Sequence, residues 1–128
     1  MIRSARPVLF SAVLLAAFAA APPAQAQQRS LDCKIGGGLN SFGIDSTGTI
    51  DMAQGQSCNL FLRMGGVLES AAISQRPKNG TLKMIGLANA VYTPKKGFSG
   101  SDEFEFTFKG SNQRVAGTSR VRIIANVK

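Results

Sequence analysis

The sequence predicts an all-β protein, an antiparallel β-sandwich of six to seven short strands behind an export signal. Three observations support this fold class. Apolar and polar residues alternate near the C-terminus, turn-forming residues recur at short intervals, and no segment after the signal has a helical period. The chain has 128 residues, which is the length of a leader and one small domain.

The N-terminus has the three parts of a secretory signal peptide. Arg3 and Arg6 give it a basic start, 8–21 is an apolar run, and a small-x-small sequence ends at Ala26. A membrane-spanning helix needs about 20 apolar residues, so the run is too short for an anchor. We therefore expect residues 1–26 to be a cleaved signal peptide and 27–128 to be one domain in the periplasm or outside the cell.

The sequence of the first half of the domain predicts fewer strands than the sequence of the second half. A strand is expected over 31–35, and 36–48 is rich in glycine and small polar residues typical of a loop. Cys58, Leu60 and Leu62 alternate with more polar neighbours and indicate the next strand, which ends at the turn Gly65-Gly66.

The middle of the chain alternates between strands and turns. Strands are expected over 70–75, 81–85 and 90–93. Residues 76–80 read as a tight hairpin turn in which Asn79-Gly80 supplies positive φ angles. The segment 94–100 is expected to form a loop.

The clearest period of two lies at the C-terminus. Phe104, Phe106 and Phe108 share one strand face, which predicts that they are core residues. After a turn within 110–117, a last strand places its apolar alternate residues on one face: Val121, Ile123, Ala125 and Val127.

The chain has two cysteines, Cys33 and Cys58, and both follow the signal. In an exported protein such a pair predicts a disulfide. The chain has no histidine, so a zinc site would lack one of its usual ligands. We expect no metal and no cofactor.

Two segments resemble a known motif. Pro77-Lys78-Asn79-Gly80-Thr81-Leu82 is followed by Tyr92-Thr93-Pro94 and by Gly97-Phe98-Ser99-Gly100-Ser101-Asp102-Glu103-Phe104. This series resembles the bacterial Ig-like, cadherin-like modules that large surface proteins carry in tandem. The resemblance covers about Ile73 to Val127 and implies an Ig-like, cadherin-like β-sandwich.

The residues that carry the resemblance read as determinants of the fold. We expect Tyr92 and Phe104 in the core, Pro94 at a strand end, Phe98 folded over the sandwich edge, and Asp102 as a cap of nearby amides. The motif residues are Pro77, Gly80, Tyr92, Pro94, Gly97, Phe98, Gly100, Asp102 and Phe104. Some related modules bind calcium between domains, but this chain lacks the clustered acidic residues that calcium needs.

Catalysis is not expected. Without histidine, the commonest general base and every Ser-His-Asp triad are excluded. No serine lies in a G-x-S-x-G elbow, and Gly36-Gly37-Gly38 lacks the lysine of a phosphate-binding loop. The sequence therefore predicts a protein that is not an enzyme.

Three functions remain open. The first is a structural or protein-interaction module of the cell envelope that contacts another envelope or surface protein. The second is a polyanion binder, since the formal charge is +8. Its candidate basic face comprises Arg120, Arg122, Lys95 and Lys96, with Lys78 and Lys83 as further cations. The third is a small secreted inhibitor or enzyme accessory that presents the loop 36–48.

Overall fold

The computed structural model describes residues 16–21, 30–37 and 41–128. Most of the predicted signal peptide lies outside these residues, and so do residues 38–40 of the predicted loop. The described part of the chain contains eight strands and no helix. No helix in this part is long and apolar enough to cross a bilayer.

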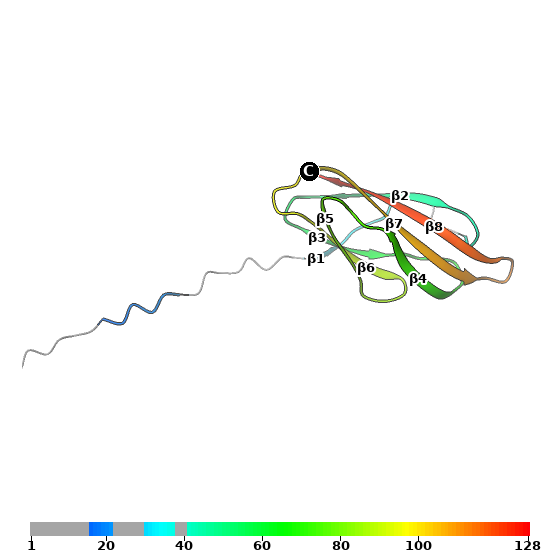
Figure 1. The fold of residues 1–128 in the computed structure, drawn as a ribbon, viewed down its shortest axis with the longest axis horizontal. Coiled ribbons are helices and arrows are strands. Elements are labelled where there is room, and N and C mark those ends of the chain that lie inside the picture. The colour runs from blue at the N-terminus through cyan, green and yellow to red at the C-terminus, as the bar shows by residue number, and fades with distance from the viewer. Residues whose placement is uncertain (1–15, 22–29, 38–40) are drawn as a thin grey trace, which may run out of the picture.

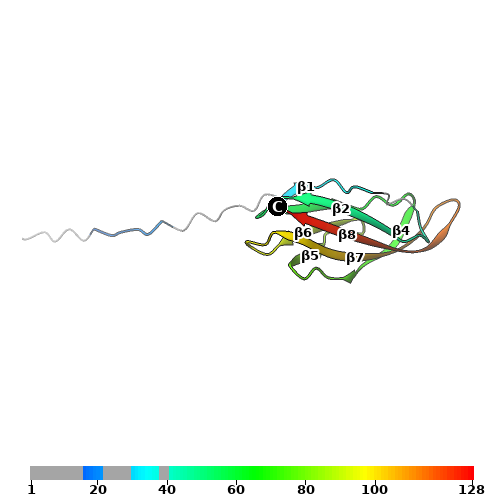
Figure 2. The same cartoon turned by 90° about the horizontal axis from the view of Figure 1, so that it is seen from above.

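The strands form two sheets of four strands, stacked in a sandwich-like arrangement (Figure 1). The first sheet has the order β1 (Ser30–Asp32), β3 (Ser57–Phe61), β6 (Asn89–Pro94), β5 (Gly80–Met84). The second has the order β2 (Ser46–Met52), β8 (Ala116–Val127), β7 (Gly100–Ser111), β4 (Val67–Gln75). The C-terminus lies at one end of the elongated domain and the β7–β8 hairpin at the other, as both views show (Figure 2).

The sheets are mixed, which corrects the prediction of an antiparallel sandwich with six to seven strands. β1 pairs parallel to β3, and β2 pairs parallel to β8. The strand β2 begins at Ser46, inside the segment predicted as a loop, and Gly36 forms a bridge to Thr49. β2 was not predicted because one of its three buried positions is Gly48. Glycine has no apolar side chain, so the alternation of apolar and polar residues is interrupted there.

The turn before β5 is not a hairpin, so the prediction for Asn79-Gly80 is wrong. β4 and β5 lie in different sheets, and the connection between them crosses the sandwich. Gly80 has no positive φ, and no non-glycine residue in the described part of the chain has one. A primed hairpin turn is needed only where two neighbouring antiparallel strands are joined directly.

The core between the sheets confirms the burial predicted from the period of two. Phe104, Phe106 and Phe108 of β7 are fully buried, as are the alternate apolar residues of β8. Tyr92 of β6 packs against Phe104 across the sandwich, with ring centroids 5.0 Å apart. Ring contacts of 5.7 and 5.8 Å continue this series along β7. The aromatic side chains therefore join the two sheets through one core.

Candidate interaction surface

Asp102 holds together the motif segments found in the sequence. It is only 4% exposed, at the start of β7. Its carboxylate accepts hydrogen bonds from the backbone N–H groups of Lys78 (3.2 Å), Asn79 (3.1 Å) and Glu103 (2.9 Å). It also accepts a 2.7 Å bond from the hydroxyl of Tyr92. The expected cap is present, and the hydrogen bond from Tyr92 is a further contact that was not predicted.

The environment of Tyr92 favours its neutral form. Burial raises the pKa of the Tyr92 phenol well above its ordinary value, and the hydrogen bond to Asp102 and that carboxylate's charge act in the same direction. The phenol therefore serves as a fixed hydrogen-bond donor at neutral pH. Both side chains are buried, and the hydrogen bond between them provides each with a partner. We call this pair the Tyr92–Asp102 clasp and assign it a structural role.

The other motif residues also shape the connections between strands. A Cβ on Gly80 would lie 2.5 Å from the carbonyl oxygen of Thr93 and 2.7 Å from Cε2 of Tyr92. Gly80 is thus required by close packing against β6. Gly100 has a φ of 132° at the corner where β7 begins, and half-buried Phe98 packs against the core nearby.

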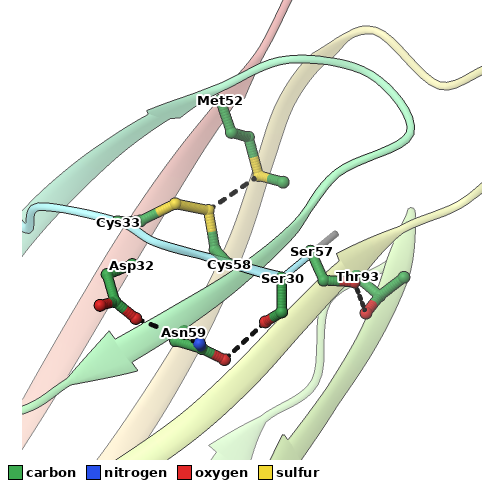
Figure 3. Close-up of a disulfide and its surroundings, with 8 residues drawn as sticks. All are labelled: Ser30, Asp32, Cys33, Met52, Ser57, Cys58, Asn59 and Thr93. Atoms are coloured by element: carbon green, nitrogen blue, oxygen red, sulfur yellow. Dashed lines mark hydrogen bonds between the residues drawn. A yellow bond between two sulfur atoms is a disulfide. The ribbon is translucent and has the colours of Figure 1, made fainter. Parts of the chain in front are cut away.

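Cys33 and Cys58 form the predicted disulfide, at a sequence separation of 25. Cys58 is fully buried, and its sulfur lies 3.6 Å from the sulfur of Met52. Because a bonded cysteine has no thiol hydrogen, this is a packing contact. Figure 3 shows the bond fixing the segment after β1 against β3.

Polar side chains beside the disulfide link β1 to β3. Ser30 donates a 2.7 Å hydrogen bond to Oδ1 of Asn59, and Nδ2 of Asn59 donates to Asp32 at 3.1 Å (Figure 3). Together with the disulfide, these contacts hold a strand of three residues at the edge of the first sheet.

The residues of the candidate basic face come from two places. Arg120 and Arg122 lie exposed on the outer face of β8, and Arg122 forms a 2.7 Å ion pair with Glu103. Lys95 and Lys96 lie in the loop 95–99, at the end of β7 where Gly100 pairs with Val127. Acidic residues of β7 stand beside the two arginines, so this face carries charges of both signs.

Two hollows lie side by side where β1 and β3 end. The first hollow, of about 700 Å³, is lined by Asp32, Cys33, Lys34, Ile35, Gly37, Phe61 and Arg63. The second hollow, of about 610 Å³, is lined by Phe61, Leu62, Arg63, Met64, Gly66, Leu68, Leu87, Ala88 and Asn89. Phe61 and Arg63 line both, so the two hollows are adjacent.

Three large apolar side chains are exposed at this end of the first sheet. Phe61 is 48% exposed, and Ile85 and Leu87 in the β5–β6 turn are 61% and 53% exposed. The register places Phe61 and the β5–β6 turn at the same end of the first sheet, because Phe61 pairs with Asn89 and Met84 pairs with Ala90. We call Phe61, Ile85 and Leu87 the sheet-end patch. Exposed apolar side chains gathered at one end of a sheet make a candidate binding surface.

The described residues contain no group of three or more histidine, cysteine or acidic side chains that could hold a metal ion. A comparison of the sequence with models of known protein families and with curated proteins finds no match.

The two hollows at the end of β3 were not predicted from the sequence. One signal was present in the sequence. Phe61 lies at a position of β3 that faces solvent, where the alternation calls for a polar residue.

Proposed function

We propose that this chain is an exported, non-catalytic Ig-like domain that acts as a structural or protein-interaction module of the cell envelope. The sheet-end patch and its two hollows are the surface through which it binds a partner protein. The observation that carries the proposal is that exposed apolar side chains and two adjacent hollows lie at the same end of the first sheet. Pockets that bind ligands are concave and mostly apolar, with a few polar groups.

The strand order supports the Ig-like part of the proposal. In immunoglobulin-type domains the strands A, B, E and D form one sheet and C, F and G the other. Taking β3 to β8 in chain order as B to G gives the orders A-B-E-D and A′-G-F-C for the two sheets. The parallel pairing of the first strand with β3 departs from the antiparallel pattern of the family.

The alternatives have weaker support. For polyanion binding, the best cations are Arg120 and Arg122, and the second of these is paired with Glu103. For an inhibitor or accessory protein, the segment 36–48 would have to protrude. Instead, Gly36 and residues from Ser46 onward are hydrogen-bonded to the second sheet or form part of it.

A photo-crosslinking amino acid placed at Leu87 tests the surface in bacterial cells that produce the chain. We expect a specific adduct with an envelope protein that is lost when Arg63 is changed to glutamate. The matched control places the crosslinker at Lys96, which is exposed at the other end of the domain. Equal adducts from both positions would rule out the sheet-end patch as the binding surface.

Export is tested separately by sequencing the N-terminus of the protein recovered from the envelope fraction. Cleavage after Ala26 would leave Gln27 as the first residue. A chain that keeps its N-terminus and stays in the cytoplasm would contradict the proposed location.

A further inference from the structure

The edge of the first sheet is left open beside Phe61. β1 pairs with β3 only from Ser57 to Asn59. The last main-chain contact is the N–H of Cys33, which donates to the carbonyl of Asn59 at 3.1 Å. After Cys33 the chain leaves this sheet, and Gly36 exchanges hydrogen bonds of 2.8 and 2.9 Å with Thr49 of the other sheet.

The main-chain groups of Phe61 point toward this open edge. Successive residues of a strand direct their N–H and C=O groups to opposite sides in the plane of the sheet. Asn59 uses the β1 side, whereas the N–H of Leu62 donates to the carbonyl of Ala88 on the β6 side at 2.8 Å. Phe61 therefore faces the β1 side, and no main-chain partner for it lies within the described residues.

The first hollow occupies the space between this open edge and the departing chain. Its lining residues include Lys34, Ile35, Phe61 and Arg63. An unpaired strand edge beside a hollow with an apolar wall is suited to an added extended segment. In such strand addition, main-chain hydrogen bonds provide affinity and hollows accept alternate side chains.

The charges around the hollow indicate what the segment carries. Lys34 and Arg63 are exposed, and no carboxylate of the described residues lies within ion-pair distance of either. Asp32, the one acidic residue of the lining, already accepts a hydrogen bond from Asn59. The hollow therefore has a net positive rim above apolar walls.

We infer that the first hollow binds an extended peptide of alternating apolar and acidic residues, which adds to the first sheet beyond β1 and pairs with the main chain of Phe61. A lipid surface would use the same apolar and basic side chains. It would not, however, satisfy the paired N–H and C=O of a strand edge, so a peptide fits better. The inference rests on the proposed interaction role and names the class of partner.

The test uses the purified chain labelled with nitrogen-15 and three acetylated, amidated heptapeptides. The first alternates valine with glutamate, the second alternates valine with lysine, and the third is the first with N-methylated peptide bonds. We expect the glutamate peptide to bind with an affinity about tenfold higher than the lysine peptide and to shift the amide resonances of Phe61 and Arg63. N-methylation should lower the affinity about tenfold or more, because it removes main-chain hydrogen bonds.

A charge-reversed variant, Lys34→Glu with Arg63→Glu, should reverse the preference and bind the lysine peptide more tightly. Both side chains are exposed, so the fold should persist, and Arg114→Glu in the β7–β8 turn serves as the matched control. The inference is overturned by equal binding of the first two peptides, by undiminished binding of the N-methylated peptide, or by no binding at about 1 mM.

A second comparison distinguishes a peptide from a membrane. Tight binding to phosphatidylglycerol vesicles that is lost in the charge-reversed variant, without peptide binding, would assign the hollow to a lipid surface and overturn the inference. If the peptides fail while the crosslink from Leu87 persists, the proposed interaction role stands and only its assignment to strand addition is wrong.

Discussion

Replacing Asp102 with alanine removes the acceptor of four hydrogen bonds at once. A hydrogen bond to a charged group contributes about 1.5–3 kcal/mol, and a buried donor left without an acceptor costs about 1–3 kcal/mol. The amides of Lys78, Asn79 and Glu103 are only partly buried, so water can replace part of what they lose. We expect the free energy of unfolding to fall by about 3–5 kcal/mol.

Changing Tyr92 to phenylalanine should cost less. It removes one hydrogen bond and leaves no buried donor, while the carboxylate keeps its three amide donors. The expected loss is about 1.5–2 kcal/mol. Asp102→Asn should fall between the two, because an amide nitrogen cannot accept the bonds that one carboxylate oxygen accepted.

The decisive experiment is a double-mutant cycle. In the Asp102→Ala background the Tyr92 hydroxyl is buried without an acceptor, so Tyr92→Phe should then cost nothing or even stabilise the domain. Urea unfolding followed by far-ultraviolet circular dichroism gives the four free energies by linear extrapolation. Glu105→Ala, on the outer face of the same strand, is the matched control and should change stability by less than about 1 kcal/mol.

The cycle also shows whether Tyr92 and Asp102 are energetically coupled. If Tyr92→Phe costs the same in both backgrounds, within about 0.5 kcal/mol, the two residues are not coupled. The hydrogen bond of the clasp would then make no contribution of its own to stability, and the role of Asp102 in the motif would need another explanation.

Three further predictions concern single features. Because its neutral phenol is favoured in the folded state, Tyr92 adds stability that is fully present below about pH 10 and is lost as the pH rises further. Tyr92 is the only tyrosine, so tyrosinate absorbance should appear only together with unfolding, and ionisation in the folded domain near pH 10 would contradict this. Reducing the Cys33–Cys58 disulfide should lower the free energy of unfolding by about 3 kcal/mol, and the reductant should have no effect on a Cys33→Ser, Cys58→Ser variant. Gly80→Ala should destabilise the domain by about 1–3 kcal/mol in thermal unfolding through its clash with β6. Gly86→Ala is its control, since a Cβ there meets nothing within 4 Å, and it should be neutral or stabilising by up to about 1 kcal/mol.

The alternation of apolar and polar residues was enough to predict which side chains of the long C-terminal strands are buried. A period of two encodes a face, so Phe104, Phe106 and Phe108 could be assigned to the core before any coordinates were known. The disulfide also followed from the sequence, because the chain has only two cysteines. The cap formed by Asp102 was predicted from the preferences of acidic side chains in turns.

Which strands are neighbours could not be predicted from the sequence and depends on long-range packing. The same residues could have formed a hairpin across Asn79-Gly80, but β4 and β5 pack against the core from opposite sheets. Strand alternation specifies a buried face but not a partner or a direction, which is why the parallel pairings of β1 and β2 were missed. The open edge at Phe61 has the same origin, since it exists only because the chain after Cys33 crosses to the other sheet.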